Sequence, residues 1–272
     1  MLDSHVKKMA DSNRLEQLED LKNVTTQLDF YEKLAAGRTA SGSISSGQHI
    51  QYIPVPITLK AQLGSPTALA IGAFATTLTT LSFALMGLRG LSVTNAFIGD
   101  FFAVAGIGMV VTAQWELVLG NTYAYTVLSA FGLFYAGFGF IITPFFGVAA
   151  AYGGADTPAY NNALGFFVLM WAVFNIFFLI GSLPLNLVYI GIFFTVQLAF
   201  TLVAAAYFLT ADGHVAAAKA TNIAAGAFAF ASGMLGYYTV GNLMCAEALG
   251  FSFPMGDTSK YWKRKRTART EV

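Results

Sequence analysis

Charged residues are scarce in this chain, and their scarcity argues against a water-soluble protein. They make up 11% of the 272 residues, against about 25% in soluble globular proteins. The stretch from 61 to 255 holds seven of them, namely Arg89, Asp100, Glu116, Asp156, Asp212, Lys219 and Glu247. A soluble domain needs charge over its surface. We therefore expect this stretch to lie in lipid.

Several chemical signatures are absent as well. Cys245 is the only cysteine, which excludes an intrachain disulfide and a cysteine-rich metal site. The sequence has no Walker loop and no CxxC, HExxH or GxSxG motif, so we expect no enzyme activity, no metal and no cofactor. The net charge is +1 and nearly all basic residues lie in the two tails, which argues against a nucleic-acid partner.

Six apolar runs are present, each long enough to cross about 30 Å of hydrocarbon as a helix, which takes roughly 20 residues. They lie at about 67–88, 94–118, 123–151, 160–182, 187–209 and 220–245. Barrel strands are only about ten residues long and alternate polar with apolar positions, unlike these continuous runs. Because backbone groups in lipid must be hydrogen-bonded internally, helices are the remaining structure that can span the membrane. The sequence predicts an all-α polytopic membrane protein with six transmembrane helices.

Three segments follow from this pattern: a polar tail at 1–63, a six-helix transmembrane domain at 64–250 and a short basic tail at 251–272. Apolar residues recur at helical spacing between 11 and 35, which fits a short amphipathic helix or, equally well, a mobile tail. Residues 37–51 are rich in serine and glycine and are typical of a flexible linker.

The charges of the tails indicate how the protein is oriented. An even number of spans places both tails on the same side of the membrane. Lys260 and the basic run at 263–266 follow the sixth span closely, whereas the opposite side has only Arg89 and Lys219. By the positive-inside bias we expect both termini in the cytoplasm, and we expect the plasma membrane as the location. The basic run also suits binding to anionic lipid.

Uncharged polar side chains lie deep in the predicted spans. Asn175 and Gln197 fall near the middle of the fourth and fifth spans, and Tyr135 adds a hydroxyl in the third. Such groups cost free energy in hydrocarbon unless they have a partner or face water. They indicate either hydrogen bonds between helices or a polar track through the bundle. An anion on such a track would be held by neutral donors and by a helix N-terminus, such as that at Ser65, Pro66 and Thr67.

Small residues recur four positions apart in two of the spans. One pair is Gly132 and Ala136, and the other stripe is Ala225, Ala229 and Gly233. Small side chains let helix backbones approach closely in lipid. We expect tight helix packing at both places.

The run from Glu116 to Tyr123 resembles the E-x-x-x-G-N-T-F signature of the acetate transporter family, through Glu116, Gly120, Asn121 and Thr122. This family holds the bacterial succinate–acetate permeases and the fungal acetate-uptake and ammonia-export proteins. The run 131–135 falls on the family's Y-G-x-F-W motif, and Pro-Met-Gly-Asp at 254–257 matches at the end of the hydrophobic body. The resemblance covers about residues 64–259.

The chain departs from the family pattern at two of these motifs. The family's first helix opens with N-P-A-P-L-G-L and contributes to its substrate site, whereas residues 65–71 read S-P-T-A-L-A-I. In the third span Phe131 replaces the tyrosine of the motif and Tyr135 replaces the tryptophan. These changes put the substrate in doubt and indicate altered selectivity.

The resemblance implies a six-helix protomer with its own pore, assembled as a homohexamer, that passes acetate and other small carboxylates such as succinate. Family members have been described both as anion channels and as proton-coupled carriers, so coupling to protons stays open. In such a pore the substrate-binding candidates are Ser65, Pro66, Thr67, Tyr135, Asn175 and Gln197. The candidates for an apolar constriction are Phe134, Phe138, Phe193 and Phe194.

Two other functions stay open. A membrane scaffold or sensor without transport fits the lost N-P-A-P opening and the amphipathic tail. Ammonium export is a label carried by some fungal relatives, but the spans place no acidic or histidine residue at depth to serve an ammonium ion.

Overall fold

The computed structural model describes residues 64–91 and 94–262, and within this part it is helical, without a named strand. Six segments are long and apolar enough to cross a membrane: α3 (Thr67–Leu85), the span Asn95–Val118, α5 (Thr122–Ile142), α7 (Pro158–Ser182), α8 (Leu187–Ala211) and α9 (Val215–Ala248). The predicted all-α class and the six spans are confirmed. The expected amphipathic helix at 11–35, the linker at 37–51 and the basic run at 263–266 lie outside the described residues.

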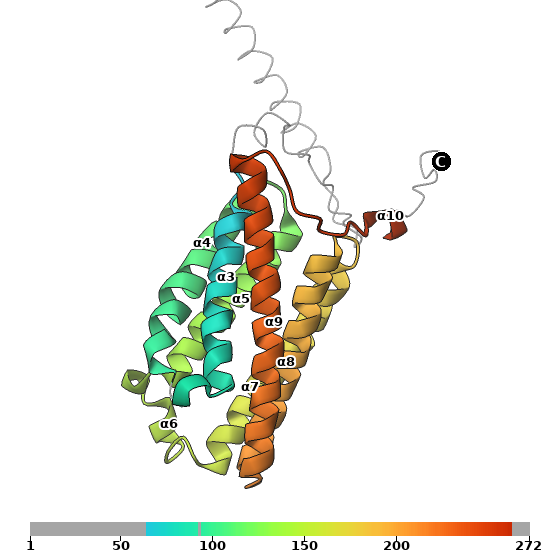
Figure 1. Cartoon of the computed structure of the whole chain (residues 1–272). Helices are drawn as coiled ribbons and strands as arrows, with labels where there is room; N and C mark the ends of the chain where they lie inside the picture. Colours follow the sequence, from blue (N-terminus) through green and yellow to red (C-terminus); the bar gives the residue numbers. More distant parts are fainter. Residues whose placement is uncertain (1–63, 92–93, 263–272) are drawn as a thin grey trace, which may run out of the picture. The chain divides into compact units, whose positions relative to one another are not determined.

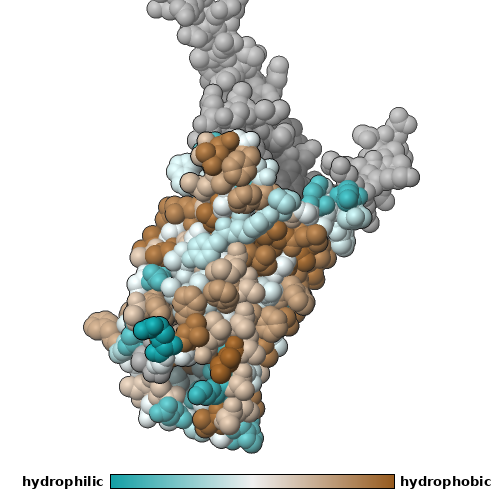
Figure 2. Space-filling model, viewed as in Figure 1, coloured by the Kyte–Doolittle hydropathy of each residue, from teal (hydrophilic) through white to brown (hydrophobic). Residues whose placement is uncertain are grey.

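Helix α9 lies between two groups of helices (Figure 1). On one side it packs along α3, and on the other along α8, which in turn packs along α7. Both α3 and α5 contact the second span, which consists of η3 (Asp100–Met109) and α4 (Val110–Val118) after a short 3-10 turn at Asn95–Phe97. Apolar side chains cover much of the flank of this bundle (Figure 2), as a surface that faces lipid requires.

The third span is shorter than its apolar run. The run predicts helix from 123 to 151, but α5 ends at Ile142. Thr143 precedes Pro144 and is extended, with φ −75° and ψ 118°, because a residue before proline is pushed out of the helical region. A 3-10 turn at Pro144–Phe146 and the short helix α6 (Val148–Ala151) follow. The expected boundary is therefore wrong, and the proline is the reason.

The second span is irregular because its first part, η3, is a π-helix, a form that is rare and is stabilised by its surroundings. Gly132 of α5 packs against it: a Cβ at this position would lie 3.1 Å from Ala105 O and 3.2 Å from Gly106 O. One turn further on, the Cβ of Ala136 lies 3.3 Å from where a Cβ on Gly106 would be. The tight packing expected at Gly132 and Ala136 is confirmed.

After α9 the chain turns back across the end of the bundle (Figure 1). Leu187 N donates to Gly256 O over 2.9 Å, and Thr258 Oγ1 donates to Leu183 O over 2.7 Å. These bonds hold the returning segment against the turn between α7 and α8. Because the six spans alternate in direction, α3 begins at the same end of the bundle at which α9 finishes. We call this end the tail side and the opposite end the far side.

Gly226 offers a test of the contact between α9 and α3. A Cβ on this residue would lie 2.9 Å from Ser82 O and 3.0 Å from Leu85 Cβ. We expect Gly226→Ala to lower the free energy of unfolding by about 1–3 kcal/mol, because overpacking forces the two backbones apart. Thermal unfolding of the detergent-purified protein measures the change.

Gly137→Ala is the matched control, since no atom lies within 4 Å of a Cβ added to Gly137 on α5. Alanine favours the helix over glycine by up to about 1 kcal/mol, so this variant should unfold at or above the wild-type temperature. A Gly226→Ala protein as stable as the Gly137→Ala protein would contradict the close contact.

Candidate functional site

A buried carboxylate lies at the tail-side end of the second span. Glu116 is 2% exposed and accepts hydrogen bonds at both oxygens. Thr67 Oγ1 donates to Oε1, and Asn121 Nδ2 donates to Oε2 over 2.9 Å. Asn121 also caps α5, because its side-chain oxygen accepts from Ala124 N over 3.3 Å. One carboxylate thus joins the start of α3, the end of α4 and the start of α5.

The motif that carries the family resemblance forms this cluster. Gly120 has a φ of 78°, which glycine adopts without strain, and it turns the chain between α4 and α5. Asn121 N then donates to Glu116 O over 2.8 Å. Thr122 opens α5, and its carbonyl accepts from Thr126 Oγ1 over 2.9 Å. The spacing of the motif therefore encodes a tight turn that brings Asn121 back to the carboxylate and the carbonyl of Glu116.

Glu116 also supplies the negative charge that the start of α3 lacks. Pro66 occupies the N-cap position of α3, and no side chain within the helix start caps it. A helix dipole stabilises a negative charge at its N-terminus by about 0.3–1 kcal/mol on an exposed surface. Ser65 and Thr67 line a polar cavity together with this glutamate. An anion arriving at the helix start would therefore meet a carboxylate that is already there.

A row of four cavities crosses the described bundle from the tail side to the far side. Neighbouring cavities share side chains: the first and second share Phe193, the second and third share Phe74 and Phe131, and the third and fourth share Leu85. The row therefore follows the length of α3 through the interior of the protomer. A pore through a helix bundle needs such a succession of spaces.

Three of these cavities are named here by their lining. The tail-side vestibule is lined by Thr67, Ile71, Asn121, Tyr123, Ala124, Val127, Leu128, Leu185, Asn186, Tyr189, Phe193 and Leu243. The central cavity is lined by Phe74, Leu78, Leu81, Leu85, Phe131, Phe134, Tyr135, Phe138, Val168, Val196, Ala199, Phe200, Val203, Tyr207 and Ala229. The far-side vestibule is lined by Ala84, Leu85, Met86, Gly87, Leu91, Thr210, Val215, Ala218, Lys219, Asn222 and Ile223.

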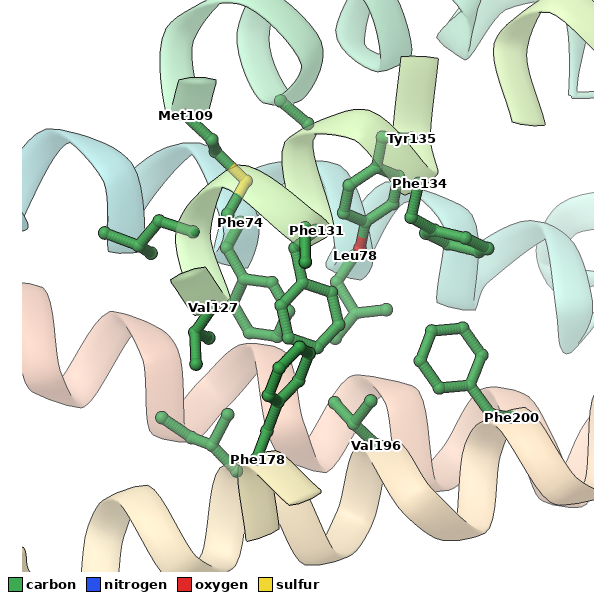
Figure 3. Packing of buried hydrophobic residues seen from close by; sticks show 14 of the residues in the cluster. Phe74, Leu78, Met109, Val127, Phe131, Phe134, Tyr135, Phe178, Val196 and Phe200 are labelled. Carbon is green, nitrogen blue, oxygen red and sulfur yellow. The ribbon is translucent and has the colours of Figure 1, made fainter. Parts of the chain in front are cut away.

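Two aromatic rings separate the second cavity from the central cavity. Phe74 and Phe131 meet edge to face, with ring centroids 5.4 Å apart. Phe131 also stacks on Phe200 with centroids 6.3 Å apart. Figure 3 shows the Phe74 and Phe131 rings side by side at the centre of the cluster. We call this pair the throat, because an apolar constriction of this kind can control passage by excluding water.

The four phenylalanines predicted to form a constriction are spread over several surfaces. Phe134 and Phe138 line the central cavity, and Phe193 lines the tail-side vestibule. Phe194 is 52% exposed and lies on the outer surface of the described protomer. Three of the four therefore border the row of cavities, whereas the throat itself consists of two other residues.

Asn175 and Gln197 lie together but away from the lining of the row. Asn175 is 1% exposed, and its Nδ2 donates to Gln197 Oε1 and to Phe193 O, each over 3.0 Å. Gln197 Nε2 donates over 3.4 Å to Thr201 Oγ1, on the exposed side of α8. These bonds join α7 to α8. The Asn175 amide nitrogen thus makes the hydrogen bonds between helices of the first interpretation, whereas its Oδ1 is buried without a partner among the described residues.

Two tyrosines, Tyr135 and Tyr207, are the residues with a polar side-chain group in the lining of the central cavity. Tyr135 is 1% exposed and Tyr207 is partly buried, and both line the cavity. Within residues 64–91 and 94–262, neither hydroxyl has a hydrogen-bond partner. The other side chains of the lining are apolar. Among the residues predicted to bind substrate, Tyr135 is thus the one that lines the central cavity.

The comparisons with known proteins agree with this architecture. A model of the GPR1/FUN34/yaaH family matches residues 50–254. The chain belongs to the GPR1/FUN34/yaaH family. This membership confirms the resemblance seen in the sequence motifs.

Two fungal proteins are similar to this chain over most of their length. The chain is 48% identical to acetate transporter protein patA of Aspergillus clavatus over 252 residues, which are 92% of this chain and 100% of patA. It is 53% identical to acetate transporter protein patA of Penicillium expansum over 203 residues, 75% and 81% of the two chains. The solved structure of the bacterial acetate channel SatP has the same fold, with a TM-score of 0.60 and 23% identity over 72% of this chain and 100% of SatP.

The throat of this GPR1/FUN34/yaaH protomer could not be located from the sequence. Phe74 is one of 25 phenylalanines, and no spacing rule sets it apart. Phe131 differs from the third-span motif that residues 131–135 resemble, because that motif has tyrosine at this position. This difference is the one feature of the sequence that points to the throat.

Removal of the Glu116 carboxylate tests the cluster that joins three helices. We expect Glu116→Ala to lower the free energy of unfolding by at least about 1.5–3 kcal/mol, the range for a hydrogen bond to a charged group. Glu247→Ala is the control, because Glu247 is exposed near the end of α9 and a surface change of this kind stays within about 0.5 kcal/mol. Thermal unfolding in detergent gives both values, and equal losses would contradict the role of Glu116.

Proposed function

We propose that this protein moves small carboxylates, acetate first among them, across a membrane through a pore in each protomer. The observation that carries the proposal is the row of cavities between the tail side and the far side, narrowed at the throat. The relatives named patA are acetate transporters and SatP is an acetate channel, which supports acetate as the substrate.

The lining suits a small substrate that is held weakly. The central cavity has a volume of about 60 Å³, whereas one water needs about 10–15 Å³ on the same scale. An acid with few heavy atoms therefore fits. Weak binding at successive places favours passage over storage. On the far side Lys219 lines the vestibule, where its positive charge attracts anions.

Ammonium export receives less support from this geometry. The central cavity has no acidic side chain in its lining, and a cation in an apolar cavity needs a negative partner. A scaffold or sensor without transport would leave the row of cavities without a role. Passage of a small acid accounts for both the row of cavities and the uncharged lining of the central cavity.

The proposal includes an assembly and an orientation. Gln197 and Thr201 lie beside the exposed Phe194 on the outer side of α8, where lipid offers polar groups no partner and a second subunit would cover them. We propose a homohexamer in the plasma membrane, with residues 1–63 and 251–272 as cytoplasmic tails, because basic residues gather at 260–266. Native mass spectrometry should then give about six times 29.0 kDa.

Radiolabelled acetate flux tests the function directly. We expect proteoliposomes that contain the full chain to take up acetate faster than empty liposomes of the same composition. Equal rates with a folded protein would contradict transport and favour a scaffold or sensor.

The throat makes a second, more specific prediction. Phe131→Leu should raise acetate flux several-fold. A smaller side chain widens the throat, so that water and a small solute pass through it more easily. Leu133→Ala is the control on the same helix, since Leu133 is 60% exposed on the outer surface and should leave the flux unchanged. An unchanged flux in a folded Phe131→Leu protein would place the narrow point elsewhere.

A further inference from the structure

The central cavity combines apolar walls with two hydroxyls that the protein itself leaves free. Tyr135 and Tyr207 line the cavity, and neither hydroxyl has a hydrogen-bond partner among the described residues. Figure 3 shows the Tyr135 oxygen turned towards Leu78, inside the cluster of rings. Buried tyrosine hydroxyls nearly always find a partner, because an unpaired polar group is costly. Two unpaired hydroxyls at one cavity indicate a ligand that pairs with them.

The lining also restricts the charge of that ligand. Among the described residues, no Lys, Arg, His, Asp or Glu lines the central cavity. An ionised carboxylate is very unfavourable in such surroundings, and a carboxyl group there takes up a proton instead. A tyrosine hydroxyl can both donate and accept a hydrogen bond. One phenol can therefore accept from the O–H of a carboxylic acid, while another donates to its carbonyl oxygen.

Building on the proposed function, we propose that the central cavity binds an undissociated short-chain monocarboxylic acid through the hydroxyls of Tyr135 and Tyr207. The carboxylate takes up its proton from water in one vestibule and returns it to water in the other. The alkyl group lies against the phenylalanine rings of the lining. A dicarboxylic acid such as succinic acid brings a second carboxyl group, for which the lining provides no further polar side chain. The cavity thus selects monocarboxylic acids.

Acetamide is the probe for this site, because it has the size of acetic acid, carries a donor and an acceptor on one carbon and stays neutral. We expect acetamide to raise the unfolding temperature of the detergent-purified wild-type protein and to inhibit acetate flux into proteoliposomes. Tyr135→Phe and Tyr207→Phe should each raise the acetamide concentration that gives the half-maximal effect. The expected factor is about 2–10-fold, which corresponds to the net free energy of one hydrogen bond.

Tyr125→Phe is the matched control. Tyr125 lies on the same helix as Tyr135 but does not line the central cavity, so acetamide should act on this variant as on the wild type. Neither Tyr135→Phe nor Tyr207→Phe removes a hydrogen bond that the described protein makes with itself, so both variants should fold.

The two readouts separate this site from the proposed function. If acetate flux is present but acetamide has no effect, or acts equally on all three variants, the site is overturned and the transport function stands. If acetate flux is absent but acetamide stabilises the protein in a manner that depends on Tyr135, the site stands and the transport function fails.

Discussion

Every polar group buried between the spans needs its partner inside the bundle, because lipid offers none. The described helices meet much of this constraint by bonding to one another, whereas Thr77 Oγ1, Thr79 Oγ1, Ser129 Oγ and Asn175 Oδ1 are buried without a partner among the described residues. Asn175 bonds across to α8, Ser232 Oγ of α9 donates to Ile192 O over 3.2 Å, and Tyr123 OH of α5 donates to Phe178 O over 2.6 Å. These bonds fix how the helices sit side by side. The lining of the interior is then left to aromatic and aliphatic side chains and to the few hydroxyls without a partner.

Hydropathy and length were sufficient to predict the all-α class and the six spans, because both are properties of single segments. The end of the third span was not predictable in this way, since the apolar run continues past Ile142, where the helix ends two residues before Pro144. The same limit applies to Asn175 and Gln197. Sequence indicates their depth in the membrane, but the direction in which a side chain turns depends on neighbouring helices. A π-helix that fits against Gly132 is likewise a product of the assembled bundle.

Glu116 gives the protomer an electrostatic asymmetry. On the tail side its carboxylate is fixed at the start of α3 by Thr67 and Asn121, which themselves line the tail-side vestibule. On the far side the vestibule has the ammonium group of Lys219. Lys219 therefore attracts an anion at the far side. At the tail side, Thr67 and Asn121 already donate their hydrogen bonds to the carboxylate of Glu116. The carboxylate of Glu116 already occupies the start of α3, and its negative charge opposes the binding of another anion there.

The two departures from the family motif on α5 act in the same direction. The family motif that residues 131–135 resemble has tyrosine and tryptophan where this chain has Phe131 and Tyr135, so relative to that motif the hydroxyl stands four residues later. Four residues are about 6 Å along a helix, on the same face. In this chain both rings of the throat are apolar, and the tyrosine of this motif, Tyr135, lines the central cavity. An apolar throat resists an ion more than a neutral molecule. A hydroxyl just beyond it then offers that neutral molecule a hydrogen bond, so both changes favour an acid that crosses without its charge.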